Sequence, residues 1–82
     1  MEGDVNQILG FVCQCIAEKE SLYEQTWRKI PVEDLIAIAR IKTYRASTLL
    51  QKNEKNKLLD DLIDSIAYLL FAIIKVSEDD LR

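Results

Sequence analysis

The scarcity of helix-breaking residues is the feature that most constrains the fold of this chain. Its 82 residues include only two glycines and one proline, Pro31. Leu, Ile, Ala, Glu and Lys dominate the rest, and these residues favour helices over strands and turns. We therefore predict an all-α fold. A chain of this length is one domain at most, 1–82, with a core that only just offsets the entropy of folding.

Three helices are predicted from the spacing of the apolar residues and from the breaks between them. The first runs over about 4–27 with Asp4 as its N-cap, and the second over about 31–51. The third runs over about 57–76 and is followed by a frayed tail, 77–82. Because the polar connector between the second and third helices is short, we expect antiparallel neighbours and a three-helix antiparallel bundle.

The predicted helix over 57–76 has more apolar surface than two short neighbours can cover. At about 100° per residue, its leucines and isoleucines span nearly half of the circumference. Tyr68 and Phe71 fall on the other half, together with Asp64 and Lys75. Self-association is the natural way to bury so much surface, so we predict a homodimer or a higher homo-oligomer that completes the core.

Charge and hydropathy exclude several classes of partner. The formal net charge of -3 disfavours binding to nucleic acid. The longest apolar run, Ile66 to Ile74, is about half of the roughly 20 residues that a membrane helix needs, and no signal-peptide pattern is present. We expect a cytoplasmic protein with no membrane partner. Histidine is absent, and Cys13 and Cys15 alone cannot complete a zinc site.

Acidic residues gather at the start of the third predicted helix and near the end of the first. Asp60, Asp61 and Asp64 lie within five residues, and Glu20 and Glu24 share one helical face. If the two helices pack with these ends level, the carboxylates converge on an oxygen-rich site that suits Mg²⁺. The alternative is structural, since aspartates stabilise helix starts and glutamates commonly decorate solvated faces. Spacing alone favours the structural interpretation.

Lys42 lies in an unexpected position, near the middle of the apolar stripe of the helix over 31–51. An ammonium group there needs a carboxylate partner or must extend towards solvent. An interface lysine is the commoner form of such a residue, and a lysine in an active site is the alternative.

Three stretches carry a resemblance to a known family. They are Lys19 to Lys29 (KESLYEQTWRK), Glu33 to Leu50 (EDLIAIARIKTYRASTLL) and Lys57 to Ile74 (KLLDDLIDSIAYLLFAII). Their order resembles the small phage and archaeal proteins of the nucleotide-modification-associated family, and more loosely the all-α MazG-like nucleotide pyrophosphohydrolases. The resemblance covers about residues 19–76. Its most telling parts are the pairs Tyr23 and Trp27, Lys42 and Arg45, and Asp61 and Asp64 followed by Tyr68.

The resemblance implies an Mg²⁺-dependent enzyme that hydrolyses a nucleoside triphosphate and releases pyrophosphate. The metal ligands that it implies are the four carboxylates Glu20, Glu24, Asp61 and Asp64. Glu24 is the candidate to orient the attacking water, and Lys42 or Arg45 would neutralise developing charge on the phosphates. A degenerate, non-catalytic relative is the other form that the resemblance allows.

A second class of function is compatible with the same fold. In it, the protein is a non-enzymatic, dimeric helical-bundle adaptor that binds another protein through its acidic surface and a patch of Phe71 and Tyr68. The two classes differ in one simple observation, because only the enzyme responds to Mg²⁺ with a nucleotide.

Overall fold

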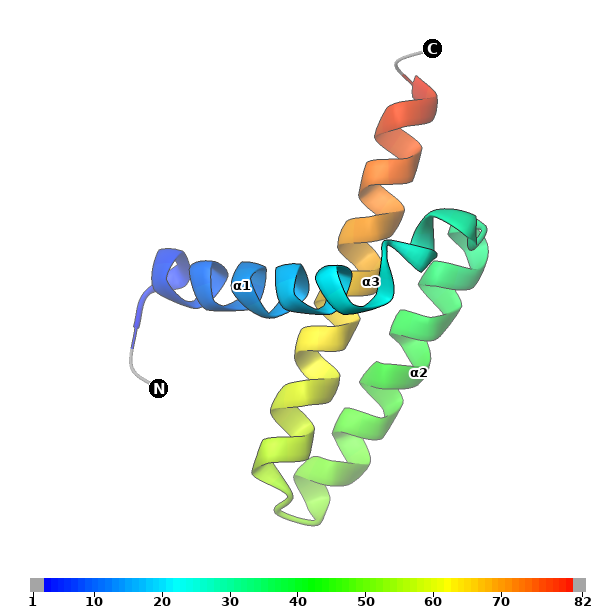
Figure 1. Cartoon of the computed structure of the whole chain (residues 1–82). Coiled ribbons are helices and arrows are strands. Elements are labelled where there is room, and N and C mark those ends of the chain that lie inside the picture. Colours follow the sequence, from blue (N-terminus) through cyan, green and yellow to red (C-terminus); the bar gives the residue numbers. More distant parts are fainter. Residues whose placement is uncertain (1–2, 81–82) are drawn as a thin grey trace.

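A helical hairpin and one helix that crosses it make up the fold (Figure 1). The computed structural model describes residues 3–80, with side chains described as far as Glu78. Its elements are α1 (Val5–Tyr23), the short 3₁₀ helix η1 (Thr26–Lys29), α2 (Val32–Gln51) and α3 (Lys55–Asp80). The described residues contain no strand, which confirms the predicted all-α class.

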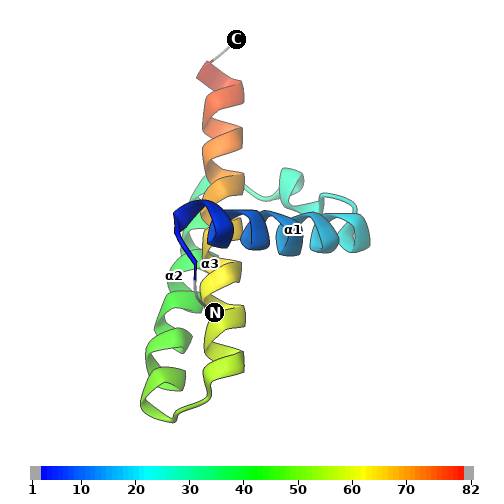
Figure 2. The ribbon, with the colours of Figure 1, turned by 90° about the vertical axis from the view of Figure 1, so that its left-hand side faces the viewer.

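The three helices do not form one antiparallel bundle. Only α2 and α3 lie antiparallel and side by side, and the C-terminal end of α3 extends beyond α2. In Figures 1 and 2, α1 lies crosswise to α3, and its N-terminal end projects beyond the hairpin. The prediction of a three-helix antiparallel bundle is therefore wrong for α1. The reason lies in the bend after α1, which turns that helix across the hairpin instead of along it.

The first helix begins where the sequence indicates and ends earlier than predicted. Asp4 is the N-cap: its Oδ1 accepts a hydrogen bond from the Gln7 backbone N–H at 3.0 Å, while Gln7 Oε1 accepts one from the Asp4 N–H at 3.2 Å. This reciprocal pair is a capping box. The helix stops at Tyr23, because Glu24 and Gln25 both adopt left-handed backbone conformations with φ of 54°. The predicted continuation to residue 27 is wrong.

Particular residues mark the start of α2 and the turn between α2 and α3. Pro31 is the N-cap of α2, and the acidic Glu33 and Asp34 follow in the first turn, where the helix dipole favours negative charge. After Gln51 the chain turns through Asn53 at φ of 59°, a conformation that asparagine tolerates. The third helix then continues to Asp80, so the predicted tail is wrong for residues 77–80, and residues 81 and 82 lie outside the described residues.

A small aromatic cluster docks η1 on α3. The rings of Trp27 and Phe71 stack at 4.4 Å between centroids and 3° between planes, and Tyr68 meets Phe71 edge-on at 5.9 Å. Trp27 and Phe71 are 6% and 7% exposed. Phe71, which the sequence places on the same half of the helix as Asp64 and Lys75, therefore belongs to the core. Leu35 is the one large side chain among the described residues that is fully buried.

Small residues allow α2 and α3 to approach closely. Ala39 and Ala46 from α2 are buried, as are Ala67 and Ala72 from α3. Ser65 is buried as well, and its hydroxyl donates to the Asp61 carbonyl at 2.9 Å, one turn earlier in α3. Apart from Phe71, the buried residues of α3 are small or polar, and many of its leucines and isoleucines are turned elsewhere.

Those larger residues form an exposed stripe along the outside of α3, which we call the outer seam. Its members are Leu59, Leu62, Ile66, Leu69, Ile73 and Val76. Each of them is between 41% and 61% exposed. The hairpin thus turns the more polar half of α3 inward and leaves much of the apolar half uncovered.

Candidate functional site: a charged cluster and a cavity where α1 crosses α3

Asp64 joins the three helices through its carboxylate. One oxygen contacts the ammonium group of Lys19 from α1, and the other lies 3.3 Å from Nζ of Lys42 from α2. The side chains of Asp64 and Lys42 are only 19% and 23% exposed, so this ion pair is partly shielded from water. The carboxylate that Lys42 requires is therefore supplied by Asp64.

Asp61, one turn earlier in α3, pairs with Arg45 from α2. Its side chain is 4% exposed, and Nε of Arg45 lies 3.3 Å from its Oδ2. Among the described residues this oxygen receives no hydrogen bond, so the contact with Arg45 is an ion pair without hydrogen-bond geometry. A buried carboxylate in this state depends on its cation, because it has lost water and gained few other donors.

Glu20 and Glu24 have different surroundings, although they share a helix end. Glu20 accepts a hydrogen bond from the Trp27 indole N–H at 3.3 Å, which ties the last turn of α1 to η1. Glu24 is exposed and occupies the C-cap of α1, where its backbone N–H donates to the Glu20 carbonyl at 2.9 Å.

A cavity of about 410 Å³ lies between α1, η1 and α3. Aromatic residues supply much of its wall, and the charged side chains that reach it are Lys19, Glu20 and Asp64. The aromatic residues are Tyr23, Trp27, Tyr68 and Phe71. A mostly apolar cavity with a few convergent polar groups is the usual form of a small-molecule site. The structure thus brings Glu20 and Asp64 to one cavity, whereas Glu24 and Asp61 do not line it.

The carboxylates as arranged do not fit a magnesium ion. Mg²⁺ requires near-octahedral oxygen coordination, to which proteins contribute carboxylates held close together. Among the side chains that the structure describes, no group of three or more acidic or cysteine residues lies close enough to hold a metal ion. Ammonium groups already neutralise Asp64, and Arg45 neutralises Asp61. The local positive charge is supplied by the chain itself.

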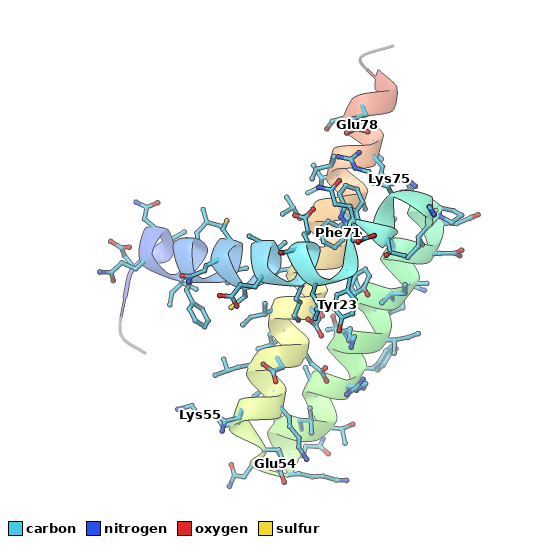
Figure 3. All side chains as sticks on the ribbon, viewed as in Figure 1. Tyr23, Glu54, Lys55, Phe71, Lys75 and Glu78 are labelled. Carbon is cyan, nitrogen blue, oxygen red and sulfur yellow. The ribbon has the colours of Figure 1, made fainter. Side chains whose placement is uncertain are left out.

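Contacts from α3 fix η1 beside the cavity, and sequence reasoning missed them. Nζ of Lys75 donates to the Arg28 carbonyl at 3.1 Å and also to the Ile30 carbonyl, while Arg28 pairs with Glu78 at 3.1 Å. Figure 3 shows Phe71, Lys75 and Glu78 following one another along α3. The signal in the sequence is their spacing of three and four residues, which places them on one helical face.

Comparisons with known proteins add no family to these observations. Models of protein families, curated proteins and solved structures were searched, and none of the three searches found a match. The class defined by the structure is therefore an all-helical protein built from an antiparallel hairpin and a crossing helix. Within residues 3–80, no helix combines the length and hydropathy needed to cross a membrane.

Proposed function

We propose that this protein is a self-associating helical module, in which the outer seam of α3 packs against the same seam of a second copy. The observation that carries the proposal is the spacing of the seam. Its six residues alternate steps of three and four, which is the pattern of a coiled-coil interface, and no described part of the chain covers them. An apolar stripe of this length on one helix is typical of an interaction surface.

The accessible surface area of the chain is larger than that of a compact monomer, which supports the presence of a partner. Its accessible surface is 6412 Å² for a mass of 9.5 kDa, whereas a compact monomer of that mass exposes roughly 5,000 Å². The radius of gyration is 13.7 Å, compared with about 12 Å for a compact domain of this length. The excess of about 1,400 Å² exceeds the roughly 800 Å² that each partner buries in a standard protein interface.

The composition of the seam favours a second copy over an unrelated partner. Ile66 and Ile73 occupy one of the two alternating core positions, and Leu62 and Leu69 occupy the other. Isoleucine at the a position of the heptad, with leucine at the d position, favours two-stranded pairing. The residues that flank the seam carry no charge, so identical helices meet without repulsion; they are Leu58, Ile63, Ser65, Leu70, Ala72 and Ser77.

The oligomeric state tests this proposal directly. Sedimentation velocity or light scattering at micromolar concentration should report twice the mass of 9.5 kDa. The double variant Ile66→Lys/Ile73→Lys should be a folded monomer, because two ammonium groups would face their counterparts across the interface. Ile41→Lys is the matched control, since Ile41 is also exposed but lies on α2, and this variant should remain a dimer. A wild-type protein that is monomeric and fully helical would refute the proposal.

A second candidate, a nucleoside triphosphate pyrophosphohydrolase, is favoured by one specific observation. The Lys42, Arg45, Asp61 and Asp64 side chains, which carry much of the family resemblance, form one charged cluster, and Asp64 also lines the aromatic cavity. In this proposal a nucleotide binds in the cavity and its phosphates compete with Asp64 for the lysines. We derive no catalytic step, because the carboxylates as arranged do not fit Mg²⁺.

Thermal unfolding separates the two candidates. A non-hydrolysable nucleoside triphosphate, added with and without Mg²⁺, should raise the melting temperature if the cavity binds nucleotide, because a ligand of the native state stabilises it. Asp64→Asn should enlarge the shift, because in this proposal the Asp64 carboxylate competes with the phosphates for Lys19 and Lys42. No shift for any of the common nucleotides would eliminate this candidate and leave the association proposal untouched.

A further inference from the structure

The bend between α1 and η1 places two residues in a backbone conformation that their side chains disfavour. Glu24 and Gln25 both have φ of 54°, in the left-handed region that glycine adopts without steric cost. Glutamate and glutamine are instead good helix formers. At the other turn of the chain, the left-handed position is held by Asn53, which tolerates it. Local preference at residues 24 and 25 therefore favours continuing the helix, against the observed bend.

The two elements joined by this bend are held very differently. On one side, η1 is anchored by the stack of Trp27 on Phe71 and by the contacts of Lys75 with the Arg28 and Ile30 carbonyls. On the other side, α1 buries only Val12 and Ile16.

Several large residues near the start of α1 are exposed, although Val12 is buried and Ile8 packs against the core. Val5, Leu9 and Phe11 are 80%, 53% and 43% exposed, and Figure 1 shows the start of α1 extending beyond the hairpin. The cavity of about 410 Å³ lies directly under the bend, so the packing of α1 on α3 is incomplete there. A loosely packed element behind a strained connection is the arrangement that favours exchange between copies.

From these observations we infer that α1 is exchanged between two copies of the chain. Residues 24 and 25 become helical, η1 stays on its own α3, and α1 docks on the α3 of the second copy. There it remakes the contact of Lys19 with Asp64 and the burial of Val12 and Ile16. The exchanged form retains these α1–α3 contacts and relieves the left-handed conformation at two residues. This inference rests on the proposed self-association, since it names the second copy as the partner of α1.

Isotope mixing distinguishes exchange from simple association without altering the sequence. Equal amounts of ¹⁴N- and ¹⁵N-labelled protein are unfolded together, refolded and treated with a carbodiimide, which joins a lysine amine to a contacting carboxylate with loss of water. Peptides that link Lys19 to Asp64 should be isotopically mixed in about half of the cases, as random pairing of chains in a symmetric dimer requires. Peptides that link Lys42 to Asp64 lie within one hairpin and should never be mixed, which makes them the internal control.

The unmixed outcomes are also decisive. A dimer by mass whose Lys19–Asp64 peptides are all unmixed would overturn the exchange and leave pairing through the outer seam intact. A monomer by mass would overturn both proposals. Formation of the Lys42 link without any Lys19 link would also overturn the exchange, because α1 would then not dock on α3 at all.

Glycine at the bend provides an independent test. The variant Glu24→Gly/Gln25→Gly removes the steric cost of the bent form and weakens the straight helix, so the mixed fraction should fall at least fivefold. Asn53→Gly is the matched control, since it places glycine at the other left-handed position and should leave the mixed fraction unchanged. An unchanged mixed fraction in the double variant would show that the bend is not the hinge.

Discussion

Replacing Trp27 with alanine tests the contact that anchors η1 on α3. The side chain is 6% exposed, its ring lies 4.4 Å from that of Phe71, and its indole N–H donates to Glu20 at 3.3 Å. Truncating a buried tryptophan to alanine costs about 3–5 kcal/mol, and about 0.5–1.5 kcal/mol of this reflects the aromatic pair. Trp27→Phe retains an aromatic ring but loses the hydrogen bond to Glu20, so we expect a smaller loss of about 1–2 kcal/mol.

A loss of this size is large for a small domain. Total stabilities are about 5–15 kcal/mol, with short chains towards the low end, so Trp27→Ala should leave little of the free energy of unfolding. At about 4–8 °C per kcal/mol, its melting temperature should fall by at least about 12 °C.

Urea unfolding followed by circular dichroism is the appropriate measurement, because the variants lack the tryptophan needed for fluorescence. All proteins must be compared at one concentration, since association makes the apparent stability depend on it. A loss below about 1 kcal/mol for Trp27→Ala would refute the conclusion that η1 is docked on Phe71.

Three further substitutions probe the charged cluster and the first helix. Asp64→Asn should lower the free energy of unfolding by about 1–2 kcal/mol, because Lys42 loses its partner at a half-buried position, and the loss should shrink in 1 M salt. Arg45→Gln should cost about 1–2 kcal/mol by leaving Asp61 without its cation, an estimate reduced because the Arg45 side chain is 60% exposed, and a neutral effect would contradict the dependence of Asp61 on it. Asp4→Ala should cost about 1 kcal/mol and reduce helicity by circular dichroism, whereas an unchanged spectrum and stability would contradict its capping role.

Features that depend on near neighbours in the chain could be predicted from the sequence. The helical class follows from composition, and the N-cap at Asp4 follows from residues within one turn of it. The end of α2 at Gln51 follows from the polar connector beside it. The sequence also indicated that the Lys42 ammonium group needs a carboxylate partner or must extend towards solvent, and the structure shows the first of these.

Other features were decided by contacts between distant segments. Local propensity favours a helix through Glu24 and Gln25, yet the docking of Trp27 on Phe71 is accompanied by a bend there. The partner of Lys42 is Asp64, which lies in another helix and does not follow from the position of Lys42.

The orientation of α3 shows the same division most clearly. Its sequence contains both the heptad spacing of the outer seam and the opposite face with Ser65 and Phe71, and periodicity alone does not say which of them turns inward. Packing against α2 and η1 buries the face with Ser65, Ala67 and Phe71, because the small residues allow the hairpin to close and Phe71 stacks on the Trp27 ring. The sequence determined that α3 has two usable faces, and tertiary contacts decided which one remains exposed for a partner.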